Sequence, residues 1–250
     1  MWSKVRRVSK YTIDMPFVRP SHMTIPTIWH RFETDKGRLR IQDVTEDMKE
    51  QAMDLLTTYF TKDEPPCRYI DIHKHPSAVL ELQKLWRNTL KDNLSLACVV
   101  DDDDQPPKIV GVNVLTVVNK DDKEESFETE DKVWAQLFGA VDLVARSVDI
   151  FKHYHVGKYL TAYGLVVHPD WRGRSVGKEL LLARIPLSKA LGIKVTATVF
   201  TAGASQAVAK KAGFQDLSEI TYAELAKKGF VFPGIERDTK ASKLMALIVD

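Results

Sequence analysis

The chain has 250 residues, enough to bury a substantial core in one large domain or two small ones. Its 36 Lys and Arg residues oppose 34 Asp and Glu residues, and this net charge of +2 argues against nucleic acid or an anionic membrane as the main partner. A hydrophobic fraction of 44% with a charged fraction of 28% is typical of a soluble globular protein and excludes a disordered chain.

The cysteine content and the N-terminus indicate the compartment. Cys67 and Cys98 are too few for a disulfide framework or a four-ligand zinc site, which favours a reducing environment. The basic N-terminus lacks the apolar region of a signal peptide, although a transit peptide is an alternative there. No apolar run approaches the ~20 residues that span a bilayer. We therefore expect a soluble, cytoplasmic protein that acts as a monomer.

The first third of the chain predicts an arm followed by two helices. Residues 1–36 have no hydrophobic period and contain three prolines, so we expect an irregular N-terminal arm and a single domain over residues 37–250. After a short strand near residues 39–44, helical spacing begins at Thr45. It is expected to end before Pro65, because proline disfavours a helical conformation in the residue before it and has no N–H. A second helix is expected from Pro76.

The middle of the chain reads as a hairpin and a helix. Two apolar runs, Leu94–Val100 and Ile109–Val118, flank the polar segment Asp101–Pro107, the pattern of a β-hairpin. The four aspartates there lack the Gly and Glu of an EF-hand, which favours a solvated turn over a calcium loop. The acidic stretch Asp121–Asp131 predicts the exposed start of a helix that continues with apolar residues from Trp134 to Val148.

The last third alternates strands with helices. Strands are expected at Tyr159–Val167, Lys194–Phe200 and Lys243–Val249, and helices at Arg174–Leu191, with a kink at Pro186, and at Gly203–Ala212. This alternation predicts an α/β or α+β protein with a mixed sheet and helices on both faces.

The segment from Val166 to Gly177 carries the strongest chemical signal. A strand ends before Pro169, a turn rich in Arg and Gly follows, and a helix begins. Free N–H groups and the helix dipole make such a turn an anion site, and its glycines let a phosphate approach the backbone. Positive charge would come from Arg172, Arg174 and Lys178. The spacing matches neither a Walker A loop nor a dinucleotide-binding turn.

The run Arg172–Gly177 resembles the acyl-CoA-binding motif of the GNAT superfamily of N-acetyltransferases, Arg/Gln-x-x-Gly-x-Gly/Ala, with Ser175 in place of the first glycine. Lys211–Phe214 is similar to the end of that superfamily's second cofactor element. The resemblance covers about residues 37–250 and implies a GNAT fold, an α+β mixed sheet splayed near Tyr159–Val167. It implies acetyl-CoA as cosubstrate and no metal. The implied cofactor-binding residues are Leu165, Val166, Val167, Arg172, Gly173, Arg174, Ser175, Val176, Gly177 and Lys178.

A narrower resemblance lies at Phe60–Pro66, which is similar to the Asp-Glu-Pro-Leu signature of insect arylalkylamine N-acetyltransferases, with Pro66 in place of the leucine. It implies that Glu64 is the general base that takes a proton from the substrate ammonium. It also implicates Thr201 and Ser205 as further catalytic residues. An N–H of residue 166 or 167 is implied to stabilise the oxyanion. The tyrosine that usually protonates the leaving thiolate is replaced by Ala209, so the general acid stays open, and a thiol pKa near ~8.5 lets the thiolate leave unaided.

Other readings of these residues stay open. By pattern alone, Glu64 is an exposed residue at a helix end. The cluster of Cys67, His73 and His75 has no fourth ligand, so a zinc site is not favoured. Aromatic residues in Phe151–His155 and Tyr222–Phe232 could line an amine pocket or belong to the core.

The resemblance implies acetylation of a small primary arylalkylamine, of the dopamine, tyramine, tryptamine or serotonin type, by direct attack in a ternary complex. One alternative is a polyamine or agmatine N-acetyltransferase. A second is a non-catalytic acyl-CoA-binding protein, against which the retained Asp63-Glu64-Pro65 sequence weighs.

Overall fold

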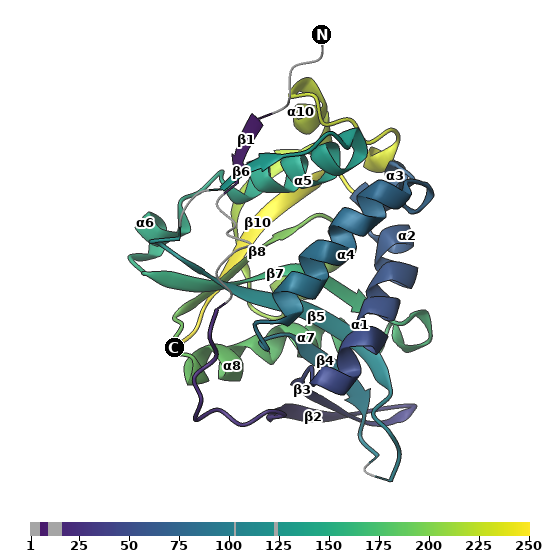
Figure 1. Ribbon diagram of the computed structural model, residues 1–250, viewed down its shortest axis with the longest axis vertical. Helices are drawn as coiled ribbons and strands as arrows, with labels where there is room; N and C mark the ends of the chain where they lie inside the picture. The colour runs from purple at the N-terminus through teal and green to yellow at the C-terminus, as the bar shows by residue number, and fades with distance from the viewer. Residues whose placement is uncertain (1–5, 10–16, 103, 123–124) are drawn as a thin grey trace.

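An eight-stranded mixed sheet runs through the molecule in the order β2-β3-β4-β5-β7-β8-β10-β9. The computed structural model describes residues 6–9, 17–102, 104–122 and 125–250. Neighbouring strands are antiparallel except β7 and β8, which are parallel (Figure 1). The strands are β2 (Ile28–Thr34), β3 (Gly37–Asp43), β4 (Leu96–Val100), β5 (Ile109–Asn119), β7 (Lys158–Val167), β8 (Val195–Phe200), β9 (Gln215–Thr221) and β10 (Ala241–Ile248); β1 (Arg6–Ser9) pairs separately with β6 (Glu125–Glu128).

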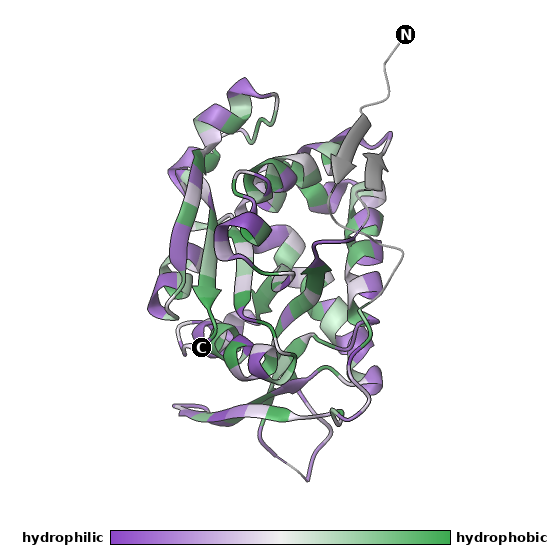
Figure 2. Cartoon of the chain, turned by 90° about the vertical axis from the view of Figure 1, so that its left-hand side faces the viewer, coloured by the Kyte–Doolittle hydropathy of each residue, from purple (hydrophilic) through white to green (hydrophobic). Residues whose placement is uncertain are grey.

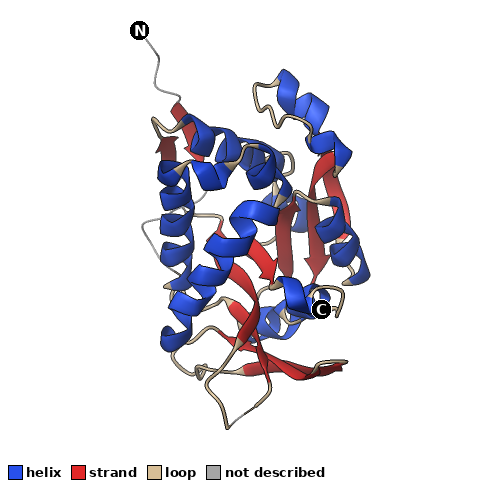
Figure 3. Cartoon of the chain, turned by 90° about the vertical axis from the view of Figure 1, so that its right-hand side faces the viewer, coloured by secondary structure: helices blue, strands red, loops and turns tan. Residues whose placement is uncertain are grey.

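Helices cover both faces of this sheet, as the sequence predicts (Figure 3). One face carries α1 (Lys49–Leu55), α4 (Pro76–Leu90) and α5 (Lys132–Ala145), and the other carries α7 (Val176–Leu182), α8 (Arg184–Ala190) and α9 (Gly203–Lys211). The remaining helices are short: α2 (Thr61–Asp63), α3 (Pro65–Tyr69), α6 (Ile150–Tyr154), α10 (Tyr222–Lys227), the π-helical turn η2 (Leu56–Phe60), and the 3-10 turns η1 (Glu46–Met48), η3 (Ile72–Lys74), η4 (Pro169–Trp171) and η5 (Ile235–Arg237). Within the described residues, no helix is long and apolar enough to cross a bilayer.

The core follows from the alternation of side chains along the strands. On β5, Val112 and Val114 pack in the cluster with α1 and α4, whereas Leu115 and Val117 belong to the cluster on the opposite face, with α7. Figure 2 shows hydrophobic residues along these central strands, between the two layers of helices. Burial on both faces explains the almost unbroken apolar runs by which these strands are predicted.

Most of the predicted elements are confirmed within a few residues. The first helix ends at Asp63, before the prolines, and α4 begins at Pro76. The hairpin β4–β5 and the strands β7, β8 and β10 lie where the hydrophobic pattern places them.

The N-terminal prediction is wrong in part. Residues 28–34 form the edge strand β2 instead of an irregular arm, with a bulge in its pairing to β3. Its mixed polar sequence gave no clean alternation, as is common for edge strands. Asp43 holds the preceding segment, because its buried carboxylate accepts hydrogen bonds from Arg19 at 2.8 Å and from the Trp29 indole at 2.8 Å. The part of the predicted arm over residues 1–5 and 10–16 lies outside the described residues.

Two further predictions need correction. The acidic stretch 121–131 does not begin a helix: it contains β6, and only Asp131 belongs to the helix start, where its carboxylate accepts from the Trp134 N–H at 2.9 Å. The helix predicted over 174–191 with a kink at Pro186 begins at Val176, and the predicted kink is a division at Ala183 into α7 and α8. The division falls there because Pro186 has no N–H to donate to the carbonyl of Leu182. Strand β9 and the short helices α6 and α10 were not predicted.

Strand β7 separates from its parallel neighbour, and this positions the site. On one side β7 pairs with β5 from Lys158 to Val167, with a bulge at Tyr163. On the other side it pairs with β8 only at Leu160 and Thr196, near the start of both strands. The carboxyl-terminal ends of β7 and β8 therefore diverge, and the sheet is open between them. This is the splay that the resemblance implies near residues 159–167.

Candidate active site

Glu64 lies at a sharp junction between two helices. Its backbone is extended, with φ −66° and ψ 124°, because the two prolines that follow disfavour a helical conformation here. Pro65 then opens α3, where a proline is tolerated because the first helical N–H has no partner within the helix. The Glu64 carboxylate caps α3 by accepting from the Cys67 N–H at 2.8 Å. The junction thus holds the side chain in one orientation.

A second contact joins Glu64 to the open end of the sheet. The Thr201 hydroxyl, immediately after β8, donates to Glu64 Oε1 at 2.5 Å across 137 residues of sequence. The Tyr222 hydroxyl donates to the carbonyl of Thr201 at 2.8 Å and fixes that residue in turn. Ser205 is not part of this group, since its hydroxyl donates to the Ala202 carbonyl at 2.9 Å. The structure therefore brings Glu64 and Thr201 together and leaves Ser205 outside.

The surroundings tune the acidity of Glu64. Burial raises the pKa of this carboxyl above the ordinary glutamate value, and the hydrogen bonds from Thr201 and Cys67 reduce the effect because they stabilise the charged form. A carboxylate with a raised pKa is a stronger base, which suits the removal of a proton from an ammonium group.

Two other titratable side chains near Glu64, those of Cys67 and Tyr222, are less suited to a catalytic role. Burial raises the pKa of the Cys67 thiol well above its usual value, and the adjacent Glu64 adds to the shift. A thiol of this kind is protonated at neutral pH and is a poor nucleophile. Burial likewise raises the pKa of Tyr222. Direct transfer to an amine fits these groups better than an acetyl-cysteine intermediate.

The open edge of β7 presents backbone groups to the gap. The N–H of His168 donates to Val110 of β5 at 2.9 Å, and successive residues of a strand direct their N–H groups to opposite sides. Val166 therefore faces β5, whereas Leu165 and Val167 face away from it. Consistently, the carbonyl of Val167 accepts from Arg172 Nε at 3.0 Å. Of the three predicted strand residues, two direct backbone N–H groups into the gap.

The loop between β7 and α7 is held in a strained conformation. Gly173 has φ +76° and Ser175 has φ +62°, both in the left-handed region. Serine pays a conformational cost there that glycine does not, which explains the glycine at this place in the motif. The loop is closed by Arg174, whose Nη1 donates to the carbonyls of Asp170 at 3.1 Å and Arg172 at 3.3 Å.

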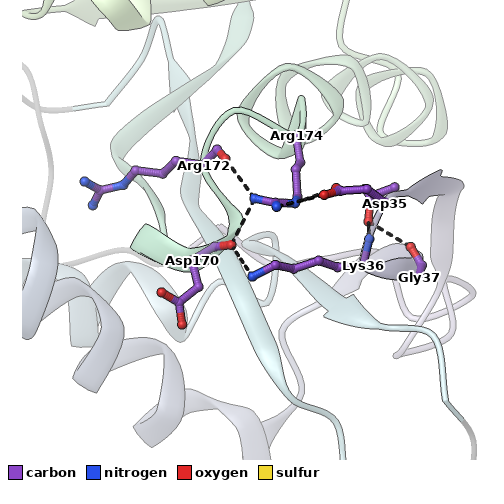
Figure 4. A network of polar contacts seen from close by, with 7 residues as sticks. Asp35, Lys36, Gly37, Asp170, Arg172 and Arg174 are labelled. Carbon is purple, nitrogen blue, oxygen red and sulfur yellow. Dashed lines mark hydrogen bonds and ion pairs between the residues drawn. The ribbon is translucent and has the colours of Figure 1, made fainter.

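Arg174 is anchored from outside the loop. Asp35, in the β2–β3 turn, accepts from its Nε at 2.6 Å and from its Nη2 at 2.8 Å, and Lys36 donates to the Asp170 carbonyl at 2.8 Å (Figure 4). Figure 4 also shows the Arg172 guanidinium pointing away from this network. Arg174 therefore shapes the loop, and its guanidinium is engaged by protein acceptors.

Arg172 links the loop to the junction that holds Glu64. Its Nη2 forms an ion pair with Asp63 Oδ2 at 2.5 Å, and both side chains are nearly half exposed. Lys178 lies near Glu179, with Nζ 3.4 Å from Oε1. Nearby, the Tyr59 hydroxyl contacts His168 Nε2 at 3.1 Å. The pairs formed by Asp35, Asp63 and Tyr59 were not predicted, because nothing in the local sequence identifies such distant partners.

Gly177, near the start of α7, has no side chain and so leaves space next to β7 and α9. A Cβ at this position would lie 3.7 Å from Leu165 and 3.9 Å from both Val167 and Val208. Its backbone conformation does not require glycine, so the missing side chain opens space beside the β7 edge and the loop. The free N–H groups of β7, this space and the turn before α7 fit the amides and phosphates of a CoA molecule.

The predicted aromatic segments do not converge. Tyr222 packs edge-on against Phe232, with ring centroids 5.7 Å apart, and lies beside Thr201 and Glu64. Phe151 instead packs on Tyr159 at the start of β7, and Figure 1 shows α6 on the opposite side of the molecule from α3. The segment 151–155 therefore does not join the surroundings of Glu64.

In the described part of the chain, metal-binding side chains do not cluster at this site. Among the residues that the structure describes, no three His, Cys, Asp or Glu side chains are placed to hold a metal ion. Cys67, His73 and His75 thus form no zinc cluster. Of the aspartates at 101–104, the structure describes all but residue 103, and those that it describes belong to no such metal-binding group.

The open edge of β7, the turn before α7 and the fixed Glu64 carboxylate fit an enzyme that transfers an acyl group from CoA. The chain belongs to the acetyltransferase (GNAT) family, whose model matches residues 49–214. This confirms the resemblance on which the fold and the acyltransferase activity were predicted, and acetyl-CoA is the acetyl donor of that family.

Known structures extend the comparison. The chain is 36% identical to a yellow fever mosquito (Aedes aegypti) protein with the provisional name arylalkylamine N-acetyltransferase 7, with a TM-score of 0.87 over 94% of this chain and 100% of that one. Arylalkylamine N-acetyltransferase 2 of Aedes aegypti shares the fold at 20% identity and a TM-score of 0.71, over 85% and 99% of the two chains. A polyamine N-acetyltransferase of Drosophila melanogaster shares it at 16% identity and a TM-score of 0.65, over 84% and 99%. Comparison with curated proteins gives no match.

Proposed function

We propose that the protein transfers the acetyl group of acetyl-CoA to the primary amine of an arylalkylamine such as dopamine, tyramine, tryptamine or serotonin. The observation that carries the proposal is the placement of Glu64, whose carboxylate has a raised pKa and is hydrogen-bonded to Thr201 at the open end of β8. The relative at 36% identity, named as an arylalkylamine N-acetyltransferase, supports the substrate class.

The residues have distinct roles in this proposal. The free N–H groups of Leu165 and Val167 face acetyl-CoA, and the N–H of Val167 stabilises the oxyanion. The turn from Arg172 to Lys178, including Gly173, Ser175, Val176 and Gly177, receives the pyrophosphate. Acetyl-CoA supplies an activated thioester. Glu64 accepts the proton of the substrate ammonium, directly or through a water, so that the nitrogen can attack, and Thr201 orients this carboxylate.

The charges near Glu64 favour an aromatic amine over a polyamine. Two nearby carboxylates are already paired: Asp63 with Arg172, and Asp238 with Arg68 of α3. A polyamine or agmatine would bring a second cation, which is costly to bury without a partner. An aromatic amine brings no second cation, and the burial of its ring is favourable by about 25 cal/mol per Å² of apolar surface removed from water.

A competition assay tests the substrate class. Equal concentrations of tryptamine, tyramine and dopamine are offered together with agmatine, putrescine and spermidine, and the acetylated products are separated. We expect higher kcat/KM for the aromatic amines. Preferential acetylation of the polyamines would favour the alternative enzyme, and CoA binding without acetylation of any amine would favour a non-catalytic acyl-CoA-binding protein.

The compartment and the oligomeric state of the enzyme are also proposed. Cys67 and Cys98 are both buried and free, which fits a reducing compartment such as the cytoplasm. We propose that the protein acts there as a monomer, which the molecular mass in solution tests.

A further inference from the structure

Arg184, the first residue of α8, has a buried cation that the proposed reaction does not use. The residue is only 1% exposed. Burial lowers the pKa of its guanidinium to about 9, so it remains charged at neutral pH. No carboxylate of the described residues pairs with it, and a buried charge without a counter-charge is costly. Such a residue is expected where it contributes to something other than stability.

One side of Arg184 contacts the strand pair β5–β7. Its Nε donates to Asn113 Oδ1 of β5 at 2.8 Å. The Asn113 amide nitrogen in turn donates to the carbonyl of Gly164 at 2.8 Å, next to the bulge in β7. The guanidinium is therefore connected through one amide to the place where β7 changes its register.

The other side of Arg184 contacts β8. Its Nη1 donates to the hydroxyls of Thr198 at 3.1 Å and Thr196 at 3.4 Å. Thr196 belongs to the one residue pair that joins β8 to β7, and Thr198 lies beyond it, where the strands diverge. The Phe214 ring covers the guanidinium, 5.8 Å from its centroid. The planar fork thus contacts β5 and β8, on either side of β7, near the point where the pairing of β7 with β8 stops.

We propose that Arg184 is a positioning residue for the acyl donor: its guanidinium bridges the β5–β7 pair and β8 and sets the width of the gap between β7 and β8. The inference rests on the proposed function, because the pantetheine arm is taken to lie along the β7 edge. A gap of fixed width presents the Leu165 and Val167 N–H groups to the acyl donor without a rearrangement on binding.

Replacement by methionine tests the role. Arg184→Met keeps an unbranched side chain but removes the charge and the fork. We expect the Kd for CoA and the KM for acetyl-CoA to rise on the order of tenfold or more, while the amine KM and kcat change much less. The melting temperature should stay the same or rise, because a buried unpaired charge has been removed. A residue that only stabilises the fold would show the opposite: a lower melting temperature with unchanged CoA affinity.

Three other variants complete the test. Arg184→Lys keeps a cation without the fork and should also weaken CoA, so full affinity in this variant would overturn the role of the fork. Thr198→Val removes one acceptor on β8 and should weaken CoA in the same direction to a smaller extent, which keeps the test readable if Arg184→Met does not fold. Arg87→Met, on the exposed face of α4 where Arg87 pairs with Glu50, is the matched control and should bind CoA normally.

The failures are distinguishable. If the unaltered protein binds no CoA in calorimetry, the proposed function fails. If it binds CoA and Arg184→Met and Thr198→Val bind equally well, the positioning role of Arg184 is overturned while the proposed function stands.

Discussion

The two edges of β7 are built differently: toward β5 the strand is paired from Lys158 to Val167, whereas toward β8 it is paired only at Leu160. The paired edge satisfies its backbone groups within the sheet and lies over the buried core. The open edge leaves the N–H groups of Leu165 and Val167 without a partner strand, with Gly177 beside these residues and Thr201 and Glu64 at the end of the neighbouring strand β8. On the proposed function, we expect stability to depend mainly on the paired edge, and binding and chemistry on the open edge. Substitutions at the two edges should therefore have different consequences.

The largest expected effect at the open edge is on the reaction rate. Glu64→Gln should lower kcat/KM by about 10²–10⁴, the usual contribution of general acid–base catalysis, while CoA affinity is retained. The loss should shrink at high pH, where free amine is abundant. Thiol release from acetyl-CoA in the presence of an amine measures it. Glu50→Gln, at an exposed glutamate of α1, is the control, and an unchanged rate in Glu64→Gln would remove this residue from the role of base.

The matching substitution at the paired edge should affect stability instead. Leu115 of β5 is fully buried opposite Ala162. Leu115→Ala should lower the free energy of unfolding by about 2–5 kcal/mol, through lost burial and the cavity that remains. Urea unfolding measures this, and calorimetry on the folded variant should give the CoA affinity of the parent. A large loss of CoA affinity with little loss of stability would contradict the comparison.

Filling the space at Gly177 should damage binding and spare the fold. The nearest atoms to an added Cβ are at ordinary contact distance, so the backbone can accept a side chain. Gly177→Val should weaken CoA by about tenfold or more, because a branched side chain obstructs the approach of the phosphates to the backbone. Gly157→Val, at an exposed glycine with open space around it, is the matched control. Equal CoA affinity in both variants would show that the cofactor lies elsewhere.

Thr201 allows a finer test through the pH dependence of the rate. Its hydroxyl stabilises the charged form of Glu64 and so lowers the pKa of that carboxyl. Thr201→Val should raise this pKa further, and the rise of kcat/KM with pH should move to higher pH. Ser205→Ala should leave the midpoint where it is, because Ser205 contacts Ala202 instead. A shift with Ser205→Ala but not with Thr201→Val would reverse the assignment of the two residues.

The smallest effect concerns the strained loop. Ser175→Gly should raise the free energy of unfolding by about 0.5–1 kcal/mol, because glycine adopts the left-handed conformation without a steric cost. The melting temperature should rise by about 1–4 °C, which calorimetry measures. Gly173→Ala is the reciprocal variant and should lower stability by about 1 kcal/mol, since only its backbone conformation opposes a side chain. No change in either variant would mean that the loop relaxes at no cost.

The local features of this protein could be predicted from the sequence. The helix end before Pro65 and the start at Pro76 depend on the geometry of proline, which acts within a residue or two. The strands β5, β7 and β8 show as apolar runs because both of their faces are covered. Arg172–Gly177 and Asp63–Pro66 are continuous motifs, so the family and the position of Glu64 could be identified without coordinates.

Only the tertiary structure decides which residues far apart in the chain become hydrogen-bond or ion-pair partners. Thr201 reaches Glu64 across 137 residues, and Arg174 reaches Asp35 across 139. The sequence indicates a cationic loop, but only the fold shows that Arg174 is engaged by Asp35 while Arg172 pairs with Asp63. Likewise, the spacing of Arg184 predicts a helical residue and not a buried cation between two diverging strands. The reason is physical: hydrophobic period and turn chemistry act over a few residues, whereas the acceptor that a side chain finds depends on how distant strands and helices pack.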